Sequence, residues 1–569
     1  MIQEKIKKLI RDALENLNVE VTNITLEHPS DLKMGDYSTN VAMACAKALN
    51  TNPKELADKI VAEISRLNTD THIERVQVAG PGFINFYLSR DFFSNSVEEI
   101  ITNENFGRNN LFSGKNIMIE YTDPNPFKPI HIGHLMTNAI GESLSRVLEY
   151  SGANISRANY QGDVGLHVAR AIWGLIHNVH LQKDDNIELK LKAANIGEAY
   201  VLGSTQYETD KTEIDAINKK VYDRSDEMIN KIYDWGFKVT MEAFEDLYEM
   251  LGTKFDFYFL ESDMAPIGLA VVQDNMGKVF TESDGAVVFK AEDYDPKLHT
   301  RVFITSQGLP TYETKELGLT ITKFKDKRDM DLSIVTTATE QMDYMRVVAK
   351  ALSLIYPEYE KKMKHITHGM MRFASGKMSS RKGNVITGES LINEARLAII
   401  EKIADRNFTE NEMNEIASAV AVSALKYSIL KQSIGGDIIY DFEKSISFEG
   451  DSGPYLQYSY ARAHSILEKA KAENIMTVFK NIPTEVIEVE KLLYRFPEVV
   501  LRSAEEYGPH YIANYLIELA RAFNSFYGNN QIIDKENPES TYRVALTSAF
   551  ATVMKNGIYL LGIKTPERM

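Results

Sequence analysis

Residues 117–134 read Ile-Met-Ile-Glu-Tyr-Thr-Asp-Pro-Asn-Pro-Phe-Lys-Pro-Ile-His-Ile-Gly-His, and this stretch decides the fold class. The apolar run Ile117–Tyr121 predicts a buried strand, and the prolines between Asp123 and Pro129 predict a turn. A helix should follow, because apolar residues recur at helical spacing in Leu135, Ala139, Leu144, Val147 and Leu148. Strand, turn and helix in this order begin a βαβ unit, so the sequence predicts an α/β protein with a parallel sheet.

Two histidines stand at the predicted start of this helix. His131 and His134 are three residues apart and should share one face, beside backbone N–H groups that have no partner inside the helix. Such a corner suits an anion, and Gly133 would let a nucleotide approach the backbone closely. Two alternatives stay open at this point. The pair could bind zinc, although no cysteines and no obvious third ligand lie nearby, or it could be two surface histidines.

The pattern along the chain predicts several domains. Residues 1–95 form helices followed by two strands, Arg75–Val78 and Phe83–Leu88, which predicts a small α+β domain. The sheet domain should span residues 110–395, with a charged helical insertion at about 180–260. Residues 396–569 predict a helical domain, with apolar residues at helical spacing in Val544, Leu546, Phe550, Val553 and Met554.

Composition limits the class of protein. The 569 residues are 44% hydrophobic, typical of a globular protein, and too many for a single core. The single cysteine, Cys45, excludes an internal disulfide and a multi-cysteine zinc site. No stretch predicts a membrane span, and residues 1–17 predict an amphipathic helix rather than a signal peptide, so we expect a cytoplasmic protein. The net charge of −16 argues against a general nucleic-acid coat but not against one specific RNA.

A second motif contains three basic side chains and two hydroxyls in a glycine-bounded segment, Gly376-Lys-Met-Ser-Ser-Arg-Lys-Gly-Asn384. Cations of this kind can neutralise the charge that builds on a pyrophosphate leaving group. Taken alone, the segment could equally be a solvated basic turn.

Together the two motifs resemble the HIGH and KMSKS signatures of class I aminoacyl-tRNA synthetases. Residues 131–134 match the first in full. In the second, Ser380 stands where the family's second lysine usually does, and this variant resembles arginyl-tRNA synthetases, in which Lys128 is thought to compensate. Further segments resemble the same family: residues 35–40, 80–85, 160–165, 450–462, 555–562 and 566–569. One departure is Val164, where the family usually has tryptophan.

The resemblance implies a class I fold: a Rossmann-type catalytic domain, an N-terminal domain that contacts the tRNA elbow, and an all-α anticodon-binding domain. It implies charge stabilisation by Lys128, His131, His134 and Lys377. ATP contacts would come from His131, Gly133, His134, Met370, Lys377, Met378, Ser379, Ser380 and Arg381.

The resemblance also implies an arginine pocket. A guanidinium is a planar cation with five donors, so a selective site needs carboxylates and neutral acceptors in a fixed arrangement. The positions that match the family's contacts are Glu120, Asn125, His131, Tyr312, Glu316 and Gln341. Glu316 departs from the usual aspartate, and the longer acid would need a slightly different pocket depth.

RNA contacts follow from the resemblance too. Phe83 and Asn85 would stack on and read an unstacked base of the D-loop, although Phe83 could instead belong to the core and Asn85 could cap a turn. For Tyr455, Tyr458 and Tyr460 we favour core packing over a stacking surface, because helical spacing puts the first two on one side.

The expected function is ligation of L-arginine to tRNA(Arg) through an arginyl-adenylate, with release of AMP and pyrophosphate. Mg²⁺ should accompany ATP; no structural metal and no membrane partner are expected, and a monomer is the family habit. Two rival functions remain open. One is a synthetase for another amino acid, which apolar residues at the pocket positions would have favoured; the other is an inactive paralogue that only binds RNA, against which the intact His131, His134 and Lys377 argue.

Overall fold

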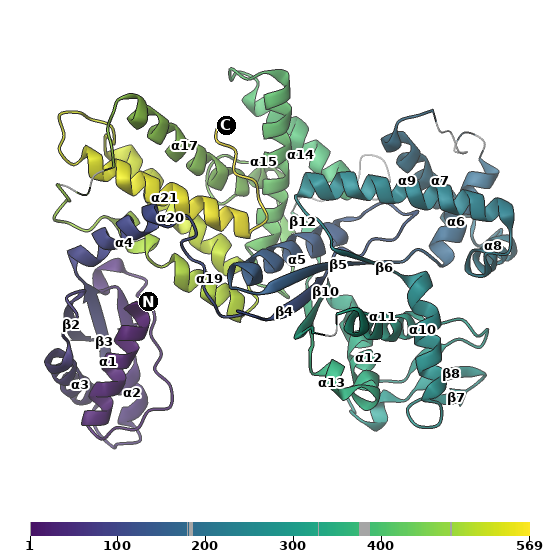
Figure 1. Ribbon diagram of the computed structural model, residues 1–569, viewed down its shortest axis with the longest axis horizontal. Helices are drawn as coiled ribbons and strands as arrows, with labels where there is room; N and C mark the ends of the chain where they lie inside the picture. The colour runs from purple at the N-terminus through teal and green to yellow at the C-terminus, as the bar shows by residue number, and fades with distance from the viewer. Residues whose placement is uncertain are drawn as a thin grey trace. The chain divides into compact units, whose positions relative to one another are not determined.

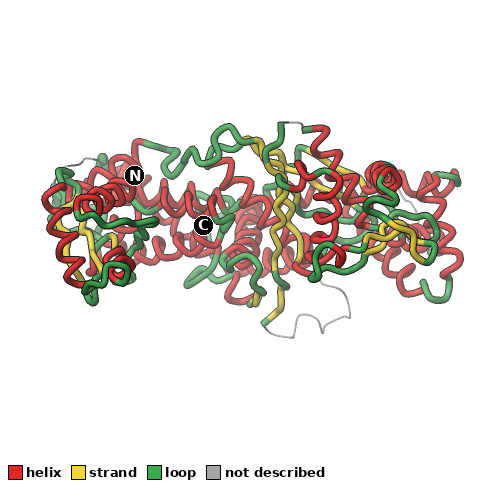
Figure 2. The backbone as a smooth tube through the Cα atoms, turned by 90° about the horizontal axis from the view of Figure 1, so that it is seen from below, coloured by secondary structure: helices red, strands yellow, loops and turns green. Residues whose placement is uncertain are grey.

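The computed structural model describes residues 2–178, 180, 186–327, 329–374, 387–477, 479 and 481–569. The chain forms two compact units, and neither is continuous in sequence. The first unit contains Met1–Gly107, Arg462–Pro497 and Glu518–Met554, and the second contains Arg108–Ala461, Glu498–Ile517 and Lys555–Met569. Figure 2 shows helices along most of the chain, with the strands gathered in separate sheets. No helix of the described residues is long and apolar enough to cross a membrane.

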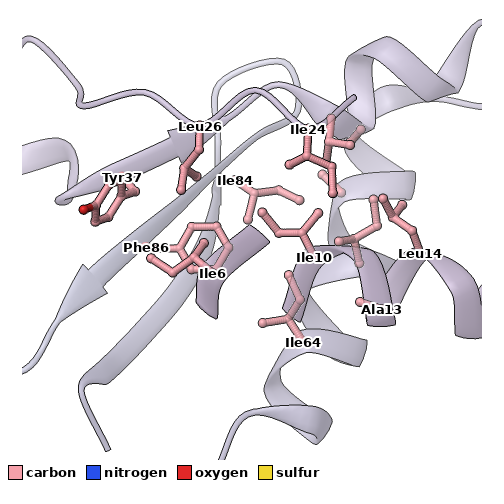
Figure 3. Close-up of a cluster of buried hydrophobic side chains, with 14 of the residues drawn as sticks. Ile6, Ile10, Ala13, Leu14, Ile24, Leu26, Tyr37, Ile64, Ile84 and Phe86 are labelled. Atoms are coloured by element: carbon pink, nitrogen blue, oxygen red, sulfur yellow. The ribbon is translucent and has the colours of Figure 1, made fainter. Parts of the chain in front are cut away.

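The first unit begins with the predicted α+β domain. The amphipathic N-terminal segment is a helix, α1, and its residues Ile6, Ile10 and Leu14 are buried against Ile84 and Phe86 of a three-stranded antiparallel sheet of order β1-β3-β2 (Figure 3). Both predicted strands are confirmed, and a third, β1, was not foreseen because it spans only three residues. The elements are α1 (Ile2–Asn16), η1 (Leu32–Met34), β1 (Tyr37–Thr39), α2 (Val41–Ala46), α3 (Pro53–Leu67), β2 (Ile73–Ala79), β3 (Phe83–Leu88) and α4 (Arg90–Thr102).

The rest of the first unit is helical. Arg90 at the start of α4 pairs with the fully buried Glu490 at 2.9 Å, and the Phe523 and Phe550 rings stack with centroids 3.8 Å apart. Four helices, α17, α19, α20 and α21, contribute residues to both units. The helices are α17 (Gly453–Ala472), α18 (Glu488–Leu493), α19 (Phe496–Glu505), α20 (His510–Asn529) and α21 (Ser540–Leu560).

The second unit is built on a parallel sheet, which confirms the α/β class. Among the described residues the sheet has five strands in the order β11-β10-β4-β5-β6, all parallel (Figure 1). The chain builds outward from β4 in both directions, so β4 and β10 are the neighbours at which the strand order reverses. Ligands of such sheets bind at the carboxyl ends of strands at this point. The strands are β4 (Asn116–Glu120), β5 (Asn154–Gln161), β6 (Phe257–Leu260), β10 (Leu332–Ala338) and β11 (Met363–His368).

Helices cover both faces of this sheet. The predicted helix after β4 is α5, which packs against β4, β5 and β10. Helices α10 and α11 lie on the other face (Figure 1). They bury Met264, Leu319 and Phe324 against Met118 and Ala158 of the strands. These helices and their neighbours are α5 (Ile132–Tyr150), α6 (Leu166–His177), α10 (Glu261–Asp274), α11 (Tyr312–Asp326), η4 (Thr339–Gln341), α12 (Met342–Ile355) and α13 (Pro357–Glu360).

Two segments are inserted between the sheet strands. The first is helical, as the sequence predicts, and its helices pack around a core that includes Ile196, Ile214 and Ile229. The second, between α10 and α11, is a small antiparallel sheet of order β7-β8-β9, which the sequence analysis missed. The elements are α7 (Leu189–Gln206), α8 (Lys211–Asp223), α9 (Glu227–Leu251), β7 (Thr281–Ser283), β8 (Ala286–Phe289), η3 (Ala291–Asp293) and β9 (Arg301–Ile304).

Beyond the sheet, the second unit continues into α14 (Gly388–Ile403), α15 (Glu410–Leu430), α16 (Phe442–Ser445) and the parallel strand pair β12 (Met371–Phe373) and β13 (Ile438–Tyr440). Lys426 of α15 is buried, and its Nζ donates to the carbonyls of Leu251 (2.7 Å) and Gly562 (2.8 Å). Burial lowers the pKa of Lys426 to about 7.

A buried ionic network surrounds Lys426, and we call it the Glu142 network. Glu142 of α5 accepts hydrogen bonds from Tyr121 Oη (2.6 Å), Arg146 Nε (2.7 Å) and Arg157 Nε (3.2 Å). Ser143 Oγ donates to the carbonyl of Leu560 at 2.8 Å. Helix α5 is therefore held by residues that are far from it in sequence.

Candidate active site

The two histidines lie at the N-terminus of α5, as predicted. The N–H of Gly133 donates to His131 Nδ1 (3.1 Å), and the N–H of His131 donates to His134 Nδ1 (3.2 Å). The two rings stack with centroids 3.7 Å apart. Because each Nδ1 is an acceptor, each neutral ring carries its proton on Nε2. The corner therefore offers two imidazole N–H donors at the N-terminus of α5.

Both imidazoles are held neutral. Burial and the nearby Lys128 ammonium lower the pKa of His131 to about 4. Burial, His131 and Lys128 lower the pKa of His134 well below its usual range. A Cβ on Gly133 would lie 3.0 Å from the His131 ring, so a larger residue would crowd the pair. Within the residues that the structure describes, no three His, Cys, Asp or Glu side chains gather where they could hold a metal ion, so the zinc alternative finds no ligand set there.

The loop between β4 and α5 is strained and folds Asn125 toward β5. Thr122, Asp123 and Phe127 have positive φ values of 80°, 47° and 66°, which are costly for residues with a side chain. The segment after β5 leaves room for Asn125: a Cβ on Gly162 would overlap Asn125 Oδ1 and come within 3.3 Å of Glu261 Oε1. Asn125 and Glu261 therefore lie together at the carboxyl end of β5.

An acidic cluster occupies the same end of the sheet. It contains Glu120, Asp123, Glu261 and Glu316, all buried or nearly so. Lys323 pairs with Glu120, and Lys315 pairs with Glu261 at 2.5 Å. Burial and the neighbouring Glu120 raise the pKa of Glu316 to about 8, and the same two causes raise the pKa of Asp123 well above its usual range. Four carboxyl groups against two lysines leave a site that favours an additional cation.

The six sequence positions predicted for arginine binding divide into three groups. Glu120, Glu316 and Asn125 converge on this cluster. Tyr312 and Gln341 are exposed: Tyr312 opens α11, one turn before Glu316 and within electrostatic reach of Glu261, and Gln341 lies in η4, between β10 and α12. His131 lies in the histidine corner, at the N-cap of α5.

Sequence reasoning missed part of the cluster. Asp123, Glu261, Tyr160 and Tyr344 were not singled out, although each lies within electrostatic reach of Glu316 or Glu120. A usable signal existed for Asp123, Tyr160 and Glu261, because each lies within three residues of the carboxyl end of a strand in the sheet, where a ligand site was expected.

The second motif lies outside the described residues, so Lys377, Met378, Ser379, Ser380 and Arg381 are not placed. The segments on either side of it are described. Met370 is 53% exposed, and its N–H donates to Asp437 Oδ1 at 2.9 Å. Thr387 forms an antiparallel bridge with His131, and the N–H of Gly388 donates to the carbonyl of Ile130 at 2.9 Å. The chain therefore returns from the second motif directly to the histidine corner.

The predicted RNA contacts lie on β3 of the first unit. Phe83 is 40% exposed, so it is not a core residue. Asn85 is buried, and its Oδ1 accepts a hydrogen bond from Ser38 Oγ at 2.7 Å. Of the three tyrosines in α17, Tyr460 is buried and Tyr455 and Tyr458 are partly buried, in line with the packing role that we favoured.

Comparisons with known proteins match the whole length of the chain. Three family models match in order: the arginyl tRNA synthetase N terminal domain (residues 4–88), the catalytic domain of class I (R) tRNA synthetases (96–442) and the DALR anticodon binding domain (456–569). The arginine–tRNA ligase of Borrelia hermsii is 30% identical over 100% of both chains, and that of Clostridium perfringens is 32% identical over 99% of this chain and 100% of its own. The solved arginyl-tRNA synthetase of Thermus thermophilus has the same fold, with a TM-score of 0.80, 24% identity and full coverage of both chains.

Proposed function

The chain belongs to the arginyl-tRNA synthetase family and charges tRNA(Arg) with arginine, and from this premise we propose how its residues divide the reaction. In the first step the carboxylate of arginine attacks the α-phosphate of ATP, and pyrophosphate leaves. In the second step a ribose hydroxyl of the terminal adenosine of the tRNA attacks the carbonyl of the arginyl-adenylate, and AMP leaves. Both steps need positioning and charge stabilisation more than covalent help from the protein.

The histidine corner is the proposed binding site for the phosphates. His131 and His134 each present an Nε2–H donor at the positive end of the α5 dipole, and the Lys128 ammonium lies beside them. Neutral imidazoles suit this task, because their donors are present at every physiological pH. Lys377 is assigned to the leaving pyrophosphate, with the remaining ATP contacts from Gly133, Met370, Met378, Ser379, Ser380 and Arg381. The return of the chain at Thr387 to His131 supports this assignment.

The acidic cluster is the proposed site for the arginine side chain, and it is the observation that carries the specificity. Glu120, Glu316 and Asn125 contribute acceptors from three elements, with Tyr312 and Gln341 at the border. A permanent cation with five donors satisfies the unbalanced carboxyls, whereas an apolar or acidic side chain would leave them unsatisfied. This arrangement favours arginine over the amino acids of the rival synthetases.

The exposed face of the N-terminal sheet is the proposed contact with the tRNA elbow. The register pairs Ala79 with Phe83, Gln77 with Asn85, and Arg75 with Tyr87, so these six residues share the face opposite to Ile84 and Phe86, which point into the core (Figure 3). The Arg75 guanidinium lies 3.8 Å above the Tyr87 ring. The exposed Phe83 and Arg75 and the partly buried Tyr87 and Gln77 suit unstacked bases and their phosphates, whereas Asn85 on the same face is buried.

The remaining proposals concern the setting of the enzyme. Mg²⁺ would enter with ATP and would supply charge neutralisation at its phosphates. We propose a cytoplasmic location, because the aminoacyl-tRNA product is used in protein synthesis. We propose a monomer, because the family is commonly monomeric. We also propose the division into residues 1–95, 110–395 with an insertion at about 180–260, and 396–569, which the order of the three family matches supports.

The test is ATP–pyrophosphate exchange with each of the twenty amino acids, with and without total tRNA. Of the twenty amino acids, we expect only arginine to support exchange, and only when tRNA is added. In Glu316→Gln we expect this exchange to be lost. Exchange with another amino acid would contradict the assignment of the acidic cluster. Absence of exchange under every condition would favour an inactive paralogue that binds RNA.

A further inference from the structure

Tyr160 lies in the acidic cluster, and no role has been assigned to it. It belongs to β5, whose residue Ala158 is in register with Glu120 of β4, so Ser156, Ala158 and Tyr160 alternate onto the face that carries Glu120. The ring packs with the core under α10 and α11, which includes Met118 and Leu319. The N–H of Tyr160 donates to Asp123 Oδ1 at 2.8 Å, which fixes the end of the strand.

The phenol oxygen of Tyr160 is buried, and among the described residues it has no hydrogen-bond partner. Burial and the carboxyl groups of Glu261, Glu316 and Glu120 raise its pKa well above the usual range, so it remains a neutral phenol that can both accept and donate. Glu316 Oε1 in the same cluster is also buried and without a partner there. Two unpartnered polar atoms in one buried cluster are costly unless a ligand satisfies them.

We propose that Tyr160 is a specificity residue for the guanidinium of arginine, whose N–H groups it and Glu316 bind side by side. The phenol oxygen, which is buried and has no partner among the described residues, accepts one guanidinium N–H. The inference rests on the proposed arginine site and adds to it a neutral acceptor on the strand opposite α11. Two acceptors that approach a planar cation from different elements define its orientation, which a single carboxylate cannot do.

The test compares Tyr160→Phe with a matched control, Tyr150→Phe. Tyr150 is a buried tyrosine at the far end of α5, whose ring contacts Arg108. Arginine-dependent ATP–pyrophosphate exchange is measured in the presence of tRNA. In Tyr160→Phe we expect the KM for arginine to rise about tenfold, the scale of one hydrogen bond to a charged group, with kcat and the KM for ATP within twofold of the parent. In Tyr150→Phe all three constants should stay within twofold.

A second measurement isolates the guanidinium end of the substrate. Agmatine keeps the guanidinium but lacks the carboxylate, and ornithine keeps the amino acid end but lacks the guanidinium. The inhibition constant of agmatine should rise with the KM for arginine in Tyr160→Phe, and that of ornithine should not. If the ring has only a structural role, the inhibition constants of agmatine and ornithine should change to the same extent. Thermal unfolding shows whether the variant is folded.

The outcomes separate this inference from the proposed function. An unchanged KM for arginine in Tyr160→Phe, or an equal rise for ATP, overturns the role of Tyr160. If Glu316→Gln raises the KM for arginine in the same experiment while Tyr160→Phe does not, only the Tyr160 assignment is wrong. If neither variant alters the KM for arginine, the acidic cluster is not the arginine site and both proposals are wrong.

Discussion

The backbone N–H of His131 donates to the imidazole Nδ1 of His134, 3.2 Å away, so the second histidine caps the helix that begins at the first. This bond fixes the tautomer of His134 and aims its Nε2–H away from the helix. The ring therefore has two tasks, one structural and one electrostatic, and a suitable substitution can separate them.

Substitution of His134 should separate those tasks. His134→Ala removes both the cap and the donor, and we expect kcat for exchange to fall about 100-fold to 1,000-fold, the cost of losing one transition-state donor. His134→Asn keeps an oxygen acceptor for the cap and an N–H donor, and it should retain more activity than His134→Ala. Steady-state exchange kinetics measure this. Equal activity of the two variants would mean that the donor has no role.

The raised pKa of Glu316 predicts that arginine binding depends on pH. In the free protein this carboxyl has a pKa of about 8, so at pH 7 most molecules hold it protonated. The guanidinium favours the ionised form, so binding expels a proton below pH 8. The Kd for arginine should fall as pH rises toward 8 and then level off.

Isothermal titration calorimetry at pH 7, in two buffers with different ionisation enthalpies, measures this proton release directly. Glu316→Gln, whose amide cannot ionise, should release fewer protons and bind more weakly. Asp123 carries a raised pKa in the same cluster, so Asp123→Asn is the second variant to compare. Binding of arginine without proton release in the parent enzyme would contradict the prediction.

The neutral histidines make stability depend on pH in the acid range. His131, His167 and His365 each have a folded-state pKa of about 4, below the value of about 6.5 expected for an unfolded chain. Between these values the unfolded state binds more protons, so the free energy of unfolding decreases as pH falls from about 6.5 toward 4. Thermal unfolding at pH 7, 6 and 5 should show a falling Tm. A double substitution of His167 and His365 by Asn should flatten this fall.

Loss of the exposed Phe83 ring on β3 should weaken the binding of tRNA but not that of arginine or ATP. Phe83→Ala removes a stacking surface, worth about 1–3 kcal/mol per base, so the KM for tRNA should rise about tenfold or more. Arginine and ATP constants should not change. Tyr294→Ala is the matched control, because Tyr294 is similarly exposed (46%) but lies in the second unit. An equal effect of both substitutions would count against a specific contact at Phe83.

Lys426 should be important for stability out of proportion to its single charge. Lys426→Met keeps most of the side-chain volume but leaves the carbonyls of Leu251 and Gly562 without their donor, and we expect a loss of about 3 kcal/mol of unfolding free energy. Lys431→Met, at the C-cap of the same helix, removes a long pair with Asp451 (3.4 Å) and should cost less than about 1 kcal/mol. Urea unfolding measures both. Similar losses would mean that the buried contacts contribute little.

The sequence predicted the central strand, the turn and α5 because apolar periodicity and prolines are local signals. It missed the β7-β8-β9 sheet, since Thr281–Ser283 is exposed throughout and shows no alternation. The resemblance singled out Glu120, Asn125 and Glu316, yet the number of carboxyl groups in the acidic cluster required the structure. Asp123 and Glu261 are distant in sequence, and strand register decides that they lie beside Tyr160.

The Glu142 network has a consequence for how this protein is made. Ser143 and Leu560 are hydrogen bonded although 417 residues separate them, and Arg146 donates to the carbonyl of Tyr559. A ribosome delivers the chain from its N-terminus at about 5–20 residues per second. Helix α5 therefore emerges well before the residues that anchor it, and it gains its full support only after Tyr559 and Leu560 have been made. The nascent chain is thus expected to have an incompletely anchored histidine corner until α21 has been made.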